Sequence, residues 1–178
     1  GLGLGIISAL KSGRWPDRLC MFISTLGITI PSFVISALLI YIFASKMRIL
    51  PTTGLDNWKS YIMPVIALAG SSTAFITRLT RSKLIDVMKS DYIRTAKAKG
   101  LSKRTVIFKH ALKNSIIPVV TYLGPLVAGI LTGSFVVEKI FSIPGLGKEF
   151  VSNVNTRDYS ALLGVIVFYS VLIVICNL

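Results

Sequence analysis

The sequence predicts an all-α integral membrane protein, a polytopic bundle of helices, and three observations support this fold class. Of its 178 residues, 53% are hydrophobic and 15% are charged, whereas about a quarter of a soluble domain is charged. The mean hydropathy is correspondingly high, at +0.73. Finally, long runs lack charge altogether, and the Lys and Arg residues behind the formal net charge of +13 concentrate in one segment.

Four runs without Asp, Glu, Lys or Arg define the expected spans, at residues 19–45, 60–77, 115–137 and 159–178. All reach or approach the roughly 20 residues that cross a hydrocarbon core of about 30 Å. Backbone polar groups must be satisfied internally in lipid, and continuous apolar runs lack the alternation of a β-barrel, so we expect helices. Residues 1–10 resemble the tail of a fifth span. Because the chain opens inside an apolar run without Met, we expect an N-terminal region to precede it.

The loops between these runs predict the orientation. Residues 78–114 contain eleven Lys and Arg against Asp86 and Asp91, and the excess of basic residues places this loop in the cytoplasm. The short loop 11–18 is then also cytoplasmic. The loops 46–59, whose one acidic residue is Asp56, and 138–158 are expected outside. Topology thus explains the cationic segment, and no nucleic-acid partner is expected.

The cationic loop is itself expected to be structured. Ser90 is a candidate cap for a short helix that begins at Asp91, favourably placed for the helix dipole, and continues over residues 92–99. Gly100 would end it in a Schellman motif followed by apolar Leu101. Ser102 is a candidate cap for a second helix, whose apolar face at i, i+3 and i+4 spacing would comprise Phe108, Ala111 and Leu112.

The segment YIRTAKAKGLSKRTVIFKHALKNSIIPVV resembles the cytoplasmic loop of binding-protein-dependent ABC importer permeases. It is most similar to the dipeptide/oligopeptide/nickel branch, whose loop reads R-T-A-x-A-K-G-L and ends in N-x-x-I-P. The stretches GRWPDRL, GITIPSFVISALLIYIFA and ILPTTG are similar to the first, B-type, permease subunit of such systems. EKIFSIPGLG and RDYSALLG resemble the external loop before its last span. The wider family's Glu-Ala-Ala triplet is replaced here by Arg94, Thr95 and Ala96.

This resemblance implies a polytopic permease that moves peptides across the membrane by alternating access, driven by ATP hydrolysis on a partner. Within the family, the short loop helix docks on the ATP-hydrolysing subunit. The corresponding coupling residues are Tyr92, Ile93, Arg94, Thr95, Ala96, Lys97, Ala98, Gly100 and Leu101. A nickel or metal-chelate importer of the same family is an alternative. A non-transport scaffold or channel with a docking loop is an alternative of another class.

The resemblance also implies the partners and the location. We expect a homologous second permease, two ATP-binding subunits and an extracytoplasmic solute-binding protein, in a bacterial or archaeal cytoplasmic membrane. ATP and Mg²⁺ would bind to the ATPase subunits, because this chain has no G-x-x-x-x-G-K-[ST] motif. No enzymatic activity, cofactor or metal site is expected on the chain, whose only histidine is His110.

Two further groups are candidates for function. Proline weakens helices, and small polar residues line pathways or allow close packing. The candidate pathway or hinge residues are Pro31, Ser32, Ser71, Ser72, Thr73, Pro118 and Pro125. In the external loop, a turn precedes an expected helix over residues 146–154. Its candidate contacts with the binding protein are Ile143, Pro144, Gly145 and Leu146; ordinary helix packing and a plain folded connection are the alternatives.

Overall fold

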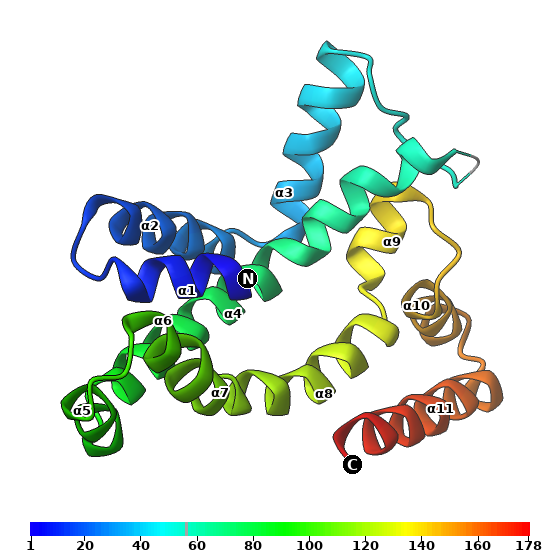
Figure 1. Cartoon of the computed structure of the whole chain (residues 1–178). Helices are drawn as coiled ribbons and strands as arrows, with labels where there is room; N and C mark the ends of the chain where they lie inside the picture. Colours follow the sequence, from blue (N-terminus) through cyan, green and yellow to red (C-terminus); the bar gives the residue numbers. More distant parts are fainter. Residues whose placement is uncertain (56) are drawn as a thin grey trace. The chain divides into compact units, whose positions relative to one another are not determined.

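The computed structural model describes residues 1–55 and 57–178, so Asp56 in the expected external loop lies outside the described residues. All regular elements of the described chain are helices (Figure 1), which confirms the predicted all-α class. Their bounds are α1 Leu2–Leu10, α2 Trp15–Thr29, α3 Ser32–Leu39, η1 Ile40–Lys46, η2 Trp58–Tyr61, α4 Ile62–Met88, α5 Asp91–Ala98, α6 Lys103–Thr105, η3 Val106–Ala111, α7 Leu112–Ser115, α8 Ile117–Leu131, α9 Phe135–Phe141, α10 Leu146–Thr156 and α11 Tyr159–Asn177.

Two of the described helices are long and apolar enough to cross a membrane, Trp58–Met88 and Tyr159–Asn177. Two interrupted pairs pass the same test when each is taken as one span: Trp15–Thr29 with Ser32–Lys46, and Lys103–Ser115 with Ile117–Leu131. The described chain therefore holds up to four candidate spans by length and composition. The boundaries of the spans and loops given above remain predictions.

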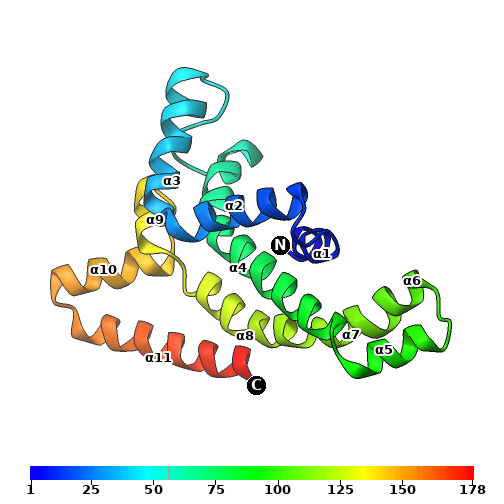
Figure 2. The same ribbon diagram turned by 90° about the vertical axis from the view of Figure 1, so that its left-hand side faces the viewer.

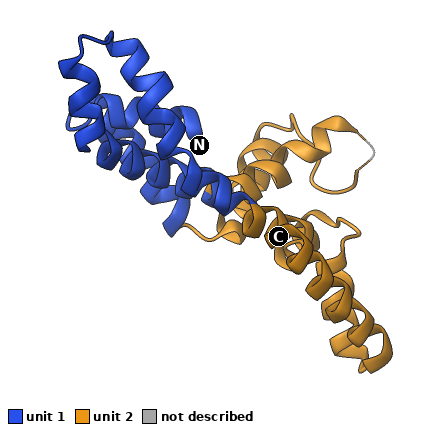
Figure 3. Ribbon diagram, turned by 60° about the horizontal axis from the view of Figure 1, so that its bottom comes forward, with its two compact units in different colours: residues 1–29, 71–123 blue, residues 30–70, 124–178 orange. Residues whose placement is uncertain are grey.

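The helices form two compact units (Figure 3). Unit 1 comprises residues 1–29 and 71–123, and unit 2 comprises residues 30–70 and 124–178. Helices α4 and α8 each contribute to both units. In unit 1, Figures 1 and 2 both show α5 beside α6, near the end of α4.

Each unit has its own apolar core. In unit 1, the end of α4, the short helix α5 and the η3 turn meet through a buried cluster of Leu84, Ile93, Ala96, Val106 and Ala111. In unit 2, Met63 at the start of α4 meets Val137 and Phe141 of α9, with half-buried side chains of α3 and η1 around them. The two clusters share no residue, so each unit has a packed core of its own.

The expected run 19–45 is interrupted at Pro31. Helix α2 begins earlier, at Trp15, and ends at Thr29, and α3 begins at Ser32. Pro31 takes the N-cap position of α3 with φ −60° and ψ 145°. Proline has no N–H to donate, and it disfavours helical backbone at the preceding Ile30, so the chain stops one helix and starts another.

Candidate functional site

The candidate docking helix α5 is shaped by the residues at its N-terminus. Ser90 occupies the N-cap position, as predicted, but the predicted capping bond is absent. Its hydroxyl donates instead to the Val87 carbonyl at 2.6 Å. Asp91 lies in the first turn, where its negative charge interacts favourably with the helix dipole. Its ion pair with Arg94, at 3.5 Å, has both side chains largely exposed and adds little stability.

The C-terminus of α5 forms the predicted Schellman motif. The Leu101 N–H donates to the Ala96 carbonyl at 3.4 Å, and the Gly100 N–H donates to the Lys97 carbonyl at 3.0 Å. Gly100 has φ +75°, a left-handed conformation that glycine adopts without steric cost. This glycine corner ends α5 after eight residues and turns the chain toward α6.

The second loop helix begins as predicted but continues differently. The Ser102 hydroxyl accepts from the Thr105 N–H at 3.3 Å, which confirms the cap. From Val106 the chain forms the π-helix η3. Its wider turn changes the helical face, so Phe108 is 62% exposed while Ala111 is fully buried. The predicted shared face of Phe108, Ala111 and Leu112 is therefore wrong, and the buried face comprises Val106, Ile107 and Ala111.

The expected docking residues divide into a buried and an exposed group. Ile93 is 0% exposed and Ala96 is also buried, because both pack into the core of unit 1. These two side chains are therefore not accessible to a partner, in contrast to the docking role expected for them. The exposed residues around the helix and its corner are Tyr92, Arg94, Thr95, Lys97, Ala98, Gly100 and Leu101.

A hydrogen bond connects α5 to α7. The Tyr92 hydroxyl accepts from the side-chain amide of Asn114 at 2.8 Å. Together with buried Ile93 and Ala96, this bond makes α5 part of the packed unit. An external force on α5 would therefore act on the end of α4 and on η3 as well.

A buried ion pair that the sequence reasoning missed lies in the same unit. Asp17 is 3% exposed and accepts from Arg81 through both carboxylate oxygens, at 2.6 and 2.7 Å. The Gly13 N–H donates to it at 2.8 Å, and the Ser8 hydroxyl donates as well. These groups tie α1, the α1–α2 turn and α4 together. Their 64-residue sequence separation leaves no local signal that would have revealed the pair.

The ion pair also shifts the ionisation of both groups. Hydrogen bonds from Arg81 hold the pKa of Asp17 well below its usual range, against the opposing effect of burial. Asp17 in turn raises the pKa of Arg81. Both residues lie in the loops predicted to be cytoplasmic, and the pair remains charged at neutral pH.

The candidate hinge and pathway residues are distributed over both units. Pro31, Ser32 and Pro125 belong to unit 2, and the other four belong to unit 1. Pro125 lies inside α8, whereas Pro118 is at its second position, where a proline is tolerated. In mid-α4, Ser71 is exposed, and Ser72 and Thr73 are half-buried.

In unit 2, the external segment is organised around a second missed carboxylate. Glu138 of α9 is 8% exposed and accepts from the Lys148 N–H, in the first turn of α10, at 2.8 Å. A Cβ atom added at either Gly133 or Gly145 would clash with its carboxylate. At a third glycine, Gly147, an added Cβ would lie 3.1 Å from the Glu138 Oε2 atom. These glycines therefore make room for the buried charge.

The candidate binding-protein contacts lie on this segment. Ile143 packs against the core of unit 2, while Pro144 and Leu146 are exposed and Gly145 is half-buried. Helix α10 confirms the helix expected over residues 146–154.

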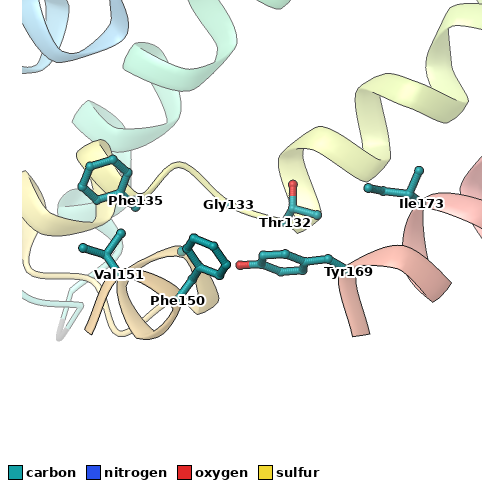
Figure 4. Close-up of a pocket in the computed structure, with 8 residues that line it drawn as sticks. Thr132, Gly133, Phe135, Phe150, Val151, Tyr169 and Ile173 are labelled. Atoms are coloured by element: carbon teal, nitrogen blue, oxygen red, sulfur yellow. The ribbon is translucent and has the colours of Figure 1, made fainter. Parts of the chain in front are cut away.

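A pocket of about 400 Å³ adjoins the segment in unit 2 (Figure 4). Figure 4 shows the Tyr169 hydroxyl pointing toward Phe150, and within the described structure this buried hydroxyl has no hydrogen-bond partner. The pocket is largely aromatic and aliphatic, which suits binding rather than catalysis. Its lining residues are Thr132, Gly133, Phe135, Gly147, Phe150, Val151, Tyr169 and Ile173.

Comparison with known proteins gives consistent matches. The model of a family described as "Binding-protein-dependent transport system inner membrane component" matches residues 1–178. The chain is 50% identical over 175 residues to the dipeptide transport system permease protein DppB of Bacillus subtilis, covering 98% of this chain and 57% of that protein. It is 44% identical over 178 residues to the glutathione transport system permease protein GsiC of Escherichia coli K12, covering 100% and 58%. The chain thus spans little more than half the length of these curated relatives.

Proposed function

The chain belongs to the family of binding-protein-dependent transport system inner membrane components, and we propose from this premise that it forms one membrane-spanning half of an ATP-driven importer of short peptides. Family membership makes it an inner-membrane component. ATP hydrolysis would take place on a separate subunit, and the chain would couple that hydrolysis to alternating access of the pathway.

The observation that carries this proposal is the construction of α5. It is an eight-residue helix, stopped by a glycine corner and packed through Ile93 and Ala96 onto the core of its unit. Ala98 lies on its opposite side, and Tyr92 and Lys97 flank the buried residues; all three side chains are exposed. A short helix with one side exposed and the other packed on the core can contact a partner subunit. Its displacement by that partner would then move the helices packed against it.

The route of transmission that we propose runs through unit 1. Displacement of α5 would act on the end of α4 through the buried cluster around Leu84. From α4, the Asp17–Arg81 pair would carry the movement to α1 and α2. Packed cores and paired charges transmit displacement because they deform little.

The substrate assignment comes from the relatives. DppB is named for dipeptide transport and GsiC for glutathione transport, so a short peptide is favoured over nickel. The proposed partners are a second permease, two ATPase subunits and a solute-binding protein. The exposed Pro144 and Leu146 of unit 2 are the proposed contacts with the binding protein.

The test is a co-purification of the full-length permease with its ATPase subunits in mild detergent. The variant combines Lys97→Glu with Ala98→Asp, since both side chains are exposed and neither belongs to the buried cluster of unit 1. We expect at least a tenfold loss of bound ATPase and of peptide-stimulated ATP hydrolysis. Ile93→Asp is unsuitable, because it would bury a charge in the core of unit 1.

The matched control is Lys109→Glu, an exposed charge reversal on η3 outside the docking side of α5. It should retain the ATPase subunit. Equal retention by the double variant and the control would contradict docking through α5. If the wild type brings no ATPase subunit with it, the scaffold or channel hypothesis replaces the importer.

A further inference from the structure

A second pocket in unit 1 lies where α1, α4 and the second loop helix converge, and its volume is about 310 Å³. This is at the lower end of the roughly 300–1,000 Å³ typical of ligand pockets, enough for part of an amphiphile. Most of its lining is aliphatic or thioether. The lining residues are Ala9, Leu10, Ser12, Ile85, Met88, Lys89, Lys103 and Ile107.

The polar part of this pocket is cationic. Lys89 follows the last residue of α4, and Lys103 begins α6, so the two lysines flank α5 in sequence and meet at one pocket. Both are exposed. Within residues 1–55 and 57–178, the ion pairs are Asp17–Arg81 and Asp91–Arg94, so neither lysine is paired with a carboxylate there. Two like charges beside one pocket favour an anion.

An anion alone does not account for the apolar lining. Leu10 is 43% exposed and Met88 is half-buried, so apolar surface next to the lysines remains open. Leu10 ends the predicted span 1–10, and Ser12 belongs to the loop predicted to be cytoplasmic. The pocket therefore lies at the expected inner boundary of the membrane, where a phosphate group adjoins acyl chains.

We infer that this pocket binds an anionic phospholipid of the inner leaflet, with Lys89 and Lys103 on the phosphate and the apolar lining against the upper part of an acyl chain. The inference rests on the proposed orientation of the 78–114 loop. A bound lipid would contact both the end of α4 and the start of α6, the two elements that hold α5. The lipid would thereby stabilise the position of α5.

The test uses the full-length permease in nanodiscs, without ATPase or binding protein, and measures its affinity for phosphatidylglycerol against phosphatidylcholine. In the variant combining Lys89→Gln with Lys103→Gln, we expect phosphatidylglycerol affinity to fall about 10- to 30-fold, because each cation contributes about one kcal/mol to anionic lipid binding. Ser12→Trp, which obstructs the pocket and keeps both lysines, should lower the affinity similarly.

The control combines Lys109→Gln with Lys113→Gln, removing the same charge from exposed positions of the same loop outside the pocket. Its affinity should stay within about threefold of the wild type. Equal losses in both double variants, equal affinity for phosphatidylcholine, full competition by inorganic phosphate, or no effect of Ser12→Trp would each overturn the inference. Because no partner subunit is present, a failure here is distinct from a failure of ATPase docking.

Discussion

Asp17 connects α1, the α1–α2 turn and α4 of unit 1 through its hydrogen bonds. Its carboxylate accepts from two side chains and one backbone N–H contributed by different elements, and almost none of it reaches solvent. A buried charge is tolerated only when it is paired and hydrogen-bonded. The position therefore accepts neither a neutral nor a shorter side chain without loss.

Asp17→Asn should destabilise the permease by about 2–4 kcal/mol, since it leaves Arg81 without its counter-charge. The value is below that of a fully buried pair, because the Arg81 side chain keeps 27% exposure. Thermal unfolding in detergent measures the loss as a lowered Tm. Asp86→Asn, which alters an exposed carboxylate on α4, the helix of Arg81, is the control and should leave the Tm unchanged.

The same residue predicts a pH dependence. The pKa of Asp17 is lowered in the folded protein, so its stabilisation is fully present above the unfolded pKa of about 3.9. It is lost progressively as the pH falls below that value toward the folded pKa. The Tm difference between the wild type and Asp17→Asn should thus be constant from pH 5 to 8 and shrink below about pH 4. A constant difference at low pH would contradict this account.

At the scale of the element, α5 depends on its glycine corner. Gly100→Ala would meet no atom within 4 Å, so its cost is that of the positive φ alone, roughly 1–2 kcal/mol. Hydrogen exchange at the Leu101 amide, which closes the corner, should accelerate about 5- to 30-fold. Gly3→Ala, also without a neighbour within 4 Å and without positive φ, should leave that exchange unchanged.

The connection between α9 and α10 is held in place by Glu138. Because its carboxylate accepts from the first turn of α10, Glu138→Ala should loosen the α9–α10 connection by about 1.5–3 kcal/mol. Trypsin cleavage after Lys148 should then accelerate about tenfold or more. Ser152→Ala alters an exposed side chain of α10 away from the cleaved bond and should not change the rate; equal acceleration would refute the role of Glu138.

At the scale of the whole molecule, the prediction concerns topology. Lys97 and Lys148 are both exposed, and they belong to loops predicted on opposite sides of the membrane. In a Cys20→Ser, Cys176→Ser background, Lys97→Cys should react with a membrane-impermeant maleimide only in inside-out vesicles. Lys148→Cys should react only in right-side-out vesicles, and labelling of both from one side would refute the orientation.

The charge-free runs predicted the all-α class, and local residue patterns predicted the caps of the 78–114 loop, because each depends on residues close together in the chain. The sequence by itself determined the helical class, the Gly100 corner and the Ser102 cap, although the Ser90 hydroxyl bonds elsewhere. Only the tertiary structure decided that Ile93 and Ala96 face inward, and that a π-turn moves Phe108 to the surface. It also decided the pairing of Asp17 with Arg81 and the burial of Glu138. The physical reason is that burial and ion pairing depend on which distant segments pack together, and no local pattern records that partner.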